Sequence, residues 1–132
     1  MVEIFSDAGI VVTMPDGLPG FEKCRRFVVM TSPTLAPFTC LQGLDEPKPS
    51  FLGVDPKLVA PDYAQALGDP DRARLDVRDK DSLLWLSLVR FESDVAKVNL
   101  QAPVVINARS MTGVQLINAD SPYSTDHAIP LD

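Results

Sequence analysis

The sequence predicts an all-β fold: a small antiparallel β-barrel or barrel-like sandwich with at most one or two short helices. Two observations lead to this prediction. The chain holds 12 Pro and 7 Gly residues, which interrupt it at the short intervals typical of strands joined by turns. Its apolar residues, 45% of 132, fall in short runs between those turns. A chain of this length is expected to form one domain, 1–132.

Strands are expected where β-branched and aromatic residues run between turn residues. They are placed at 10–13, 27–31, 38–42, 50–55, 83–91, 104–107 and 114–117. Two successive turns are expected at 15–17 and 18–20, and a hairpin loop with Gly113 at 109–113. One short helix is predicted over 61–67, with Asp62 as its N-cap and 68–70 as its end.

Two charged or polar segments complete the chain. Segment 72–82 is the most charged and is interpreted as an exposed connection or an edge. Segment 119–132 is polar and interrupted by Pro, and it is expected to form a C-terminal tail that lies on the barrel or stays mobile.

The run 83–91 is apolar on both alternating faces through its first half, which indicates a strand covered on both sides at the centre of the sheet. A buried helical turn is the competing interpretation. Val89 and Phe91 continue in phase with Trp85 and favour the strand. We therefore expect Trp85 and Leu86 to be buried on opposite faces.

Charge narrows the class of partner. Asp and Glu total 18 against 12 Lys and Arg, a net charge of −6, which argues against nucleic-acid binding because neutralising phosphates requires clustered cations. An acidic domain instead attracts a basic protein partner, although the same charge also serves solubility alone. No apolar run approaches the roughly 18 residues of a membrane-spanning helix, and no signal peptide opens the chain. A cytoplasmic protein without membrane contact, monomeric when free, is expected.

The residues that usually carry catalysis are scarce. His127 is the single His and falls in the predicted tail, where a base is seldom held rigidly. Cys24 and Cys40 lack the spacing of a zinc site and are expected to be reduced, with Cys40 sharing a core face with Phe38. The carboxylates on charged segments are interpreted as solvated surface. We expect neither an enzyme nor a cofactor or metal.

Three segments resemble one known family. Residues 12–22, Val-Thr-Met-Pro-Asp-Gly-Leu-Pro-Gly-Phe-Glu, resemble the early "TFPxGLPGFE" signature of the FliW family of flagellar assembly factors. Residues 99–107, Asn-Leu-Gln-Ala-Pro-Val-Val-Ile-Asn, match its "NLQAPxxIN" signature, with Gly-Val-Gln following at 113–115. Residues 120–123 are similar to its closing "DSPY". The order and spacing also agree, over nearly the whole chain.

This resemblance implies a small β-barrel that binds flagellin in the cytoplasm. It also implies that the protein binds and antagonises the carbon storage regulator CsrA, a translational repressor. Secretion of flagellin then frees the factor to sequester the repressor, so that flagellin synthesis follows assembly by partner exchange. The sequence departs from the family pattern at Met14, where Phe is usual, and in 126–128, which is Asp-His-Ala where Arg-His-Pro is usual.

The signature residues are interpreted first as architecture. Gly in the two turns permits a positive φ, Pro fixes φ near −65°, and Phe21 is expected to fold back into the core. In 99–101, alternation sends Leu100 one way and the two amides the other, where they either pin the loop backbone or face a partner. The structural set is Pro15, Gly17, Pro19, Gly20, Phe21, Leu100, Pro103 and Asn107.

Candidate partner-binding residues are Asp45 and Glu46, in the loop 43–47, followed by Asn99 and Gln101. Adjacent carboxylates on a loop between strands suit a basic partner, and an ordinary polar turn is the alternative. Two other functions are kept open. One is a small-molecule-binding β-barrel or an enzyme that uses carboxylates in the barrel mouth; the other is a structural subunit of a homo-oligomer.

Overall fold

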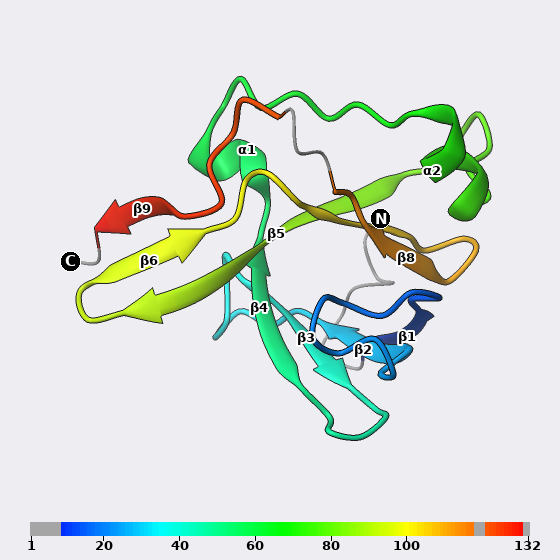
Figure 1. Cartoon of the computed structure of the whole chain (residues 1–132), viewed down its shortest axis with the longest axis horizontal. Coiled ribbons are helices and arrows are strands. Elements are labelled where there is room, and N and C mark those ends of the chain that lie inside the picture. Colours follow the sequence, from blue (N-terminus) through cyan, green and yellow to red (C-terminus); the bar gives the residue numbers. More distant parts are fainter. Residues whose placement is uncertain (1–8, 118–120, 131–132) are drawn as a thin grey trace.

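The computed structural model describes residues 9–117 and 121–130 (Figure 1). Among them, nine strands form one sheet, accompanied by two short helices. The strands are β1 (Ile10–Thr13), β2 (Arg26–Met30), β3 (Thr39–Gly43), β4 (Ser50–Val54), β5 (Leu83–Glu92), β6 (Val95–Val98), β7 (Val104–Asn107), β8 (Thr112–Gln115) and β9 (His127–Pro130). The helices are α1 (Pro56–Val59) and α2 (Asp69–Arg74). The predicted all-β class is confirmed.

Seven of the strands close into a barrel. The sheet order β4-β3-β2-β1-β8-β7-β5 returns to its start through pairing of β4 with β5. Every neighbouring pair in the ring is antiparallel except β1 and β8, which run parallel and meet at the single register pair Thr13–Thr112. The antiparallel prediction therefore holds for all of the ring except this seam.

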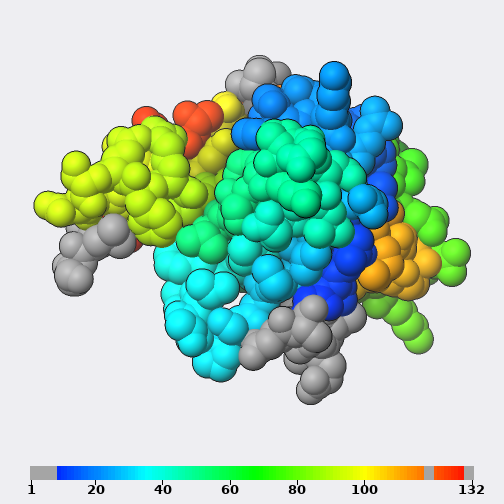
Figure 2. Space-filling model, turned by 90° about the horizontal axis from the view of Figure 1, so that it is seen from below, coloured from blue at the N-terminus to red at the C-terminus, as the bar shows by residue number. Residues whose placement is uncertain are grey.

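The second half of β5 leaves the barrel. There it pairs with β6, and β6 pairs in turn with β9, so that these three strands form a wing beside the barrel (Figure 1). We call it the β5–β6–β9 extension. In the view from below, its hairpin projects from the body of the molecule (Figure 2). The sequence pattern predicts no strand at 95–98 or at 127–130, where the structure pairs β9 with β6.

Two apolar clusters lie on the two sides of the barrel wall. The inner cluster draws on five ring strands and includes Val12, Phe27, Leu41, Leu86 and Ile106. The outer cluster lies between the outward faces of β5, β7 and β8 and the segment 59–77, and it also includes Val54 of β4 and Val98 of β6. Trp85 belongs to the outer cluster and Leu86 to the inner one, and both are buried. This confirms their predicted burial on opposite faces of β5.

The helix predicted over 61–67 is wrong. That segment is irregular, and helices form on either side of it. Asp55 caps α1, accepting a hydrogen bond from the Lys57 backbone N–H at 2.9 Å, with Pro56 in the first turn. Tyr63 explains the extended path between the helices, because its buried ring is held in the outer cluster and its hydroxyl donates to the Leu100 carbonyl at 2.7 Å.

Two burial predictions also need correction. Cys24 is buried, but Cys40 is only half-buried. On β3 the buried positions are Thr39, Leu41 and Gly43, because the alternation of a strand does not reveal which of its faces turns inward. Segment 72–82 is not wholly exposed either, since Leu75 is fully buried in the outer cluster.

Candidate functional site

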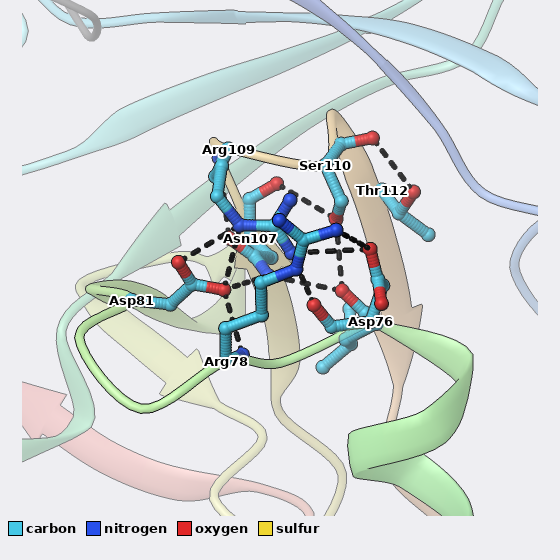
Figure 3. Close-up of polar contacts among 8 residues, drawn as sticks. Asp76, Arg78, Asp81, Asn107, Arg109, Ser110 and Thr112 are labelled. Atoms are coloured by element: carbon cyan, nitrogen blue, oxygen red, sulfur yellow. Dashed lines mark hydrogen bonds and ion pairs between the residues drawn. The ribbon is translucent and has the colours of Figure 1, made fainter.

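A polar cluster fastens the segment after α2 to the β7–β8 hairpin (Figure 3). Its centre is Asn107, which is fully buried at the end of β7. The Asn107 amide donates to the Leu75 carbonyl at 2.9 Å and to the Asp81 carboxylate at 3.0 Å. Its side-chain oxygen accepts from the Arg109 backbone N–H at 3.1 Å. Asn107 thus makes hydrogen bonds to the segment after α2 and to the β7–β8 hairpin at once, which is the architectural role expected of it.

Arg109 closes this cluster from the outside. Its Nε donates to Asp81 at 2.9 Å and its Nη2 donates to Asp76 at 3.1 Å. The pKa of Asp81 lies below its ordinary value, chiefly because the carboxylate accepts the Arg78 backbone N–H and also because it accepts bonds from Asn107 and Arg109. The pKa of Arg109 is raised by its bonds to Asp81 and Asp76. Arg78 also pairs with Asp76 at 3.7 Å, so two guanidinium groups balance two carboxylates within the cluster.

The first signature builds the two predicted turns. The Gly17 N–H donates to the Met14 carbonyl at 2.9 Å, and the Phe21 N–H donates to the Leu18 carbonyl at 2.7 Å. Gly17 and Gly20 have φ of 61° and 85°, which confirms the positive φ expected of both. A Cβ on Gly17 would also lie 2.6 Å from the Phe21 carbonyl oxygen, so only glycine fits there.

The side chains around these turns divide between the core and the surface. Leu18 is buried in the inner cluster, and Phe21 packs against that cluster while half-buried, edge-on to Phe51 with ring centroids 5.6 Å apart. Pro15 and Pro19 are exposed.

The second signature is an anchored loop. Asn99 accepts the backbone N–H groups of Gln101 and Ala102 at 3.1 Å each, so its amide pins its own loop. Leu100 is buried, and its backbone N–H donates to the Ser124 carbonyl at 2.9 Å. Pro103 is buried and its carbonyl accepts from the Leu116 N–H at 2.9 Å. Gln101 is half-buried.

The acidic loop separates its two carboxylates. Asp45 accepts the backbone N–H groups of Arg25 and Arg26 at 3.0 and 3.1 Å and pairs with the Arg26 guanidinium at 2.8 Å. The pKa of Asp45 is lowered, first by the Arg26 side chain and then by these backbone donors. Glu46 beside it is exposed. Asp45 therefore ties the β3–β4 loop to the start of β2, and Glu46 is the carboxylate of the pair that faces solvent.

Parts of all three family signatures meet in one groove. One compartment, about 360 Å³, is lined by Gly17, Pro19 and Glu22 of the first signature, by 113–115, and by Asp71 and Arg74 of α2. The second, about 430 Å³, is lined by Gln101 and Pro103 of the second signature and by 121–123 of the closing one. Asp71 and Ile117 line both compartments, which therefore adjoin. We call the two together the signature groove.

Several residues of this region were not predicted as site residues. Asp76 and Asp81 fell in segment 72–82, which was interpreted as an exposed connection or an edge, and Arg109 fell in the predicted hairpin loop 109–113. Their pairing depends on contacts between distant parts of the chain. Tyr63 and Tyr123 stack at 4.4 Å between ring centroids, and the Tyr123 hydroxyl accepts the Ala64 N–H at 2.9 Å. The "DSPY" resemblance was the one signal that singled out Tyr123.

The remaining candidates lie elsewhere. His127 is exposed in β9, at the edge of the extension. Within residues 9–117 and 121–130, no group of three or more His, Cys, Asp or Glu side chains is arranged to hold a metal ion. No helix in the described part of the chain is long and apolar enough to cross a membrane.

The fold and the site together define a small closed β-barrel domain in which the motif residues form turns, anchor loops and line a surface groove. The family model of the FliW protein matches residues 2–129. The flagellar assembly factor FliW of Geobacter sulfurreducens is 36% identical over 127 residues, covering 95% of this chain and 79% of the relative. That of Treponema pallidum is 33% identical over 125 residues, covering 93% and 83%.

A solved structure agrees with these relatives. The crystal structure of a flagellar assembly factor FliW is similar with a TM-score of 0.80 and 29% identity, covering 89% of this chain and 83% of the other. The chain belongs to the FliW family of flagellar assembly factors.

Proposed function

We propose that the protein binds flagellin in the cytoplasm and binds and antagonises the carbon storage regulator CsrA, coupling flagellin synthesis to flagellar assembly by partner exchange. The mechanism is competition or exchange between protein partners, with no chemical step catalysed by this chain.

Membership of the FliW family carries the proposal, because the family match spans residues 2–129 and the resemblance of the signatures implies these partners. The net charge of −6 supports a basic partner, since opposite charge accelerates encounter.

The internal bonds of the four candidate residues decide how their role is tested. The side-chain oxygens of Asp45 and Asn99 accept hydrogen bonds from backbone N–H groups of the chain itself. Replacing these residues therefore changes the loops as well as any interface. Glu46 is exposed and Gln101 lines the signature groove. We propose Glu46 and Gln101 as the members of the set that contact a partner directly.

The test is titration of the purified chain with purified flagellin and purified CsrA, each followed by calorimetry. We expect 1:1 complexes with each partner, binding that weakens as salt rises, and loss of one partner when the other is added in excess. If the chain binds neither flagellin nor CsrA at low salt, the proposal is refuted.

Glu46→Lys tests the acidic loop, with Glu92→Lys on the exposed end of β5 as the matched charge reversal. The Glu46 variant is expected to slow association and flatten its salt dependence, as a rim charge does, while the Glu92 variant behaves as the parent chain. Equal kinetics for both variants would leave Glu46 an ordinary surface residue.

A further inference from the structure

We propose that the signature groove binds a peptide segment of a partner protein in which apolar or aromatic side chains stand next to a Lys or Arg. The two compartments of the groove differ in chemistry, and each selects one part of this segment. The inference rests on the proposed function only for the choice of natural partners.

The larger compartment is the apolar end. Its apolar and aromatic lining side chains include Tyr63, Trp85, Pro103, Leu116, Ile117 and Tyr123, and Asp71 and Gln101 line it as well. Trp85 is held in the outer cluster, and the two Tyr hydroxyls are fixed by hydrogen bonds to the Leu100 carbonyl and the Ala64 N–H. Aromatic side chains that are already immobile lose little entropy on binding. Such pockets anchor the large apolar side chains that dominate protein interfaces.

The smaller compartment is the acidic end. Its lining holds the carboxylates of Asp16, Glu22 and Asp71 and the guanidinium of Arg74, a balance of 1 − 3 = −2. Arg74 is paired with both Asp16 and Asp71. Glu22 is exposed, and its pKa is lowered chiefly because it accepts the Gly20 N–H at 3.0 Å. The groove therefore keeps a fixed negative charge, which attracts a cationic side chain.

Ile117 joins the two ends. Its side chain is 76% exposed, the largest exposed fraction among the large hydrophobic residues of the described chain, and it lines both compartments. A single exposed apolar residue needs no explanation. One that stands between an aromatic pocket and an acidic pocket is placed to contact the middle of a bound segment.

Charge favours a segment of another protein, and not a second copy of this chain, as the occupant of the groove. The protein carries −6 overall, so a second acidic copy brought to the acidic end meets like charge. A segment with Lys or Arg beside apolar side chains satisfies both ends. The two adjoining compartments suit a stretch of polypeptide that places successive side chains in each.

The first test needs no natural partner. Trp85 is the only Trp of the sequence and lines the apolar end, so its fluorescence reports on occupancy. The probe is a synthetic peptide of Leu, Phe and Lys, and its counterpart carries Glu in place of Lys. We expect the Lys peptide to shift the Trp85 emission saturably and the Glu peptide to leave it unchanged. Equal responses to the two peptides, or no response to the Lys peptide, would overturn the assigned chemistry.

The second test uses flagellin and CsrA with paired variants. Ile117→Arg is matched by Leu58→Arg on α1, where Leu58 is 65% exposed, and Glu22→Lys is matched by Glu92→Lys. The two groove variants are expected to weaken binding of at least one partner about tenfold, the effect of losing a central contact, and the controls less than about twofold. Circular dichroism and urea unfolding confirm that each variant is folded.

The outcomes separate this inference from the proposed function. If the parent chain binds both partners and Ile117→Arg binds them as tightly as Leu58→Arg does, the groove is not the docking site while the proposed function stands. If the parent chain binds neither, the proposed function fails and the peptide titration still decides the groove. If light scattering finds a dimer that Ile117→Arg dissociates, the groove is an interface between copies and the inference is wrong.

Discussion

The closed barrel and the β5–β6–β9 extension share strand β5, and the two halves of this strand differ in how deeply their side chains are buried. In the barrel, β5 has β7 and β4 as neighbours, and Trp85 and Leu86 are buried on its two faces. In the extension the same strand pairs with β6, and Phe91 is 48% exposed. Phe91 lies in phase with Trp85 along the strand, so its greater exposure reflects what packs over each half of β5, and composition alone does not decide burial.

The strongest test of this difference is Trp85→Ala in the barrel wall. We expect a loss of about 3–5 kcal/mol in the free energy of unfolding, the usual cost of removing a large aromatic side chain from a core. Urea denaturation followed by circular dichroism measures it. A loss under about 1 kcal/mol would show that the outer cluster contributes little to the barrel.

Asn107→Ala tests the fastening between the barrel and the segment after α2. The Leu75 carbonyl and the Arg109 N–H would lose a buried partner, which costs about 1–3 kcal/mol of unfolding free energy. Asn99→Ala is the matched control, because it removes two backbone contacts at a half-buried loop. If the control proves as costly as Asn107→Ala, burial of the amide is not what matters.

A smaller effect is expected for Phe91→Ala in the extension. Phe91 is packed edge-on against Phe38, with ring centroids 5.9 Å apart, and such pairs contribute about 0.5–1.5 kcal/mol. Half of its surface is already in water, so little else is lost. A cost near that of Trp85→Ala would mean that Phe91 contributes as much to stability as a fully packed residue of the outer cluster.

The smallest effect is expected at acid pH. The pKa values of Asp45 and Asp81 are lowered in the fold, so their contribution to stability is present above the ordinary Asp pKa of about 3.9 and is lost as pH falls below it. Solvent screens the partners Arg26 and Arg109, which keeps the effect modest. Unfolding free energy measured from neutral to acid pH should fall less steeply in Asp81→Asn than in Asp94→Asn, an exposed control on the β5–β6 turn.

The ring of strands was largely predictable because its signals are local. Turn residues at 15–20 mark chain reversals within a few residues of themselves. The hairpin before β8 was also predicted, although Gly113, which was assigned to its loop, lies inside β8. Strand β5 was recognisable by its length and by apolar residues on both faces. The strand β9 was not, because a polar segment with His127 and Pro130 carries little strand preference of its own and is held by pairing with β6.

The site could be predicted only in part, for a related reason. The φ values of Gly17 and Gly20 follow from turn chemistry, and the backbone bonds of Asn99 are short-range. The meeting of Asp81 with Arg109, 28 residues apart, depends on the closed barrel. So does the groove, which brings α2 against β8. Sequence patterns predict neither the Asp81–Arg109 pair nor the groove, because both arise from tertiary packing.

The seam between β1 and β8 gives the barrel a preferred place to open. On one edge β1 is held by a four-residue antiparallel ladder to β2, and on the other by one register pair and the Thr13 N–H bond to the Met111 carbonyl at 2.8 Å. Breaking that second edge would convert the closed ring into an open sheet and leave every other strand ladder of the ring intact. We therefore expect local opening of the barrel to begin at this seam, and amide protons along it to exchange with solvent long before those of β5.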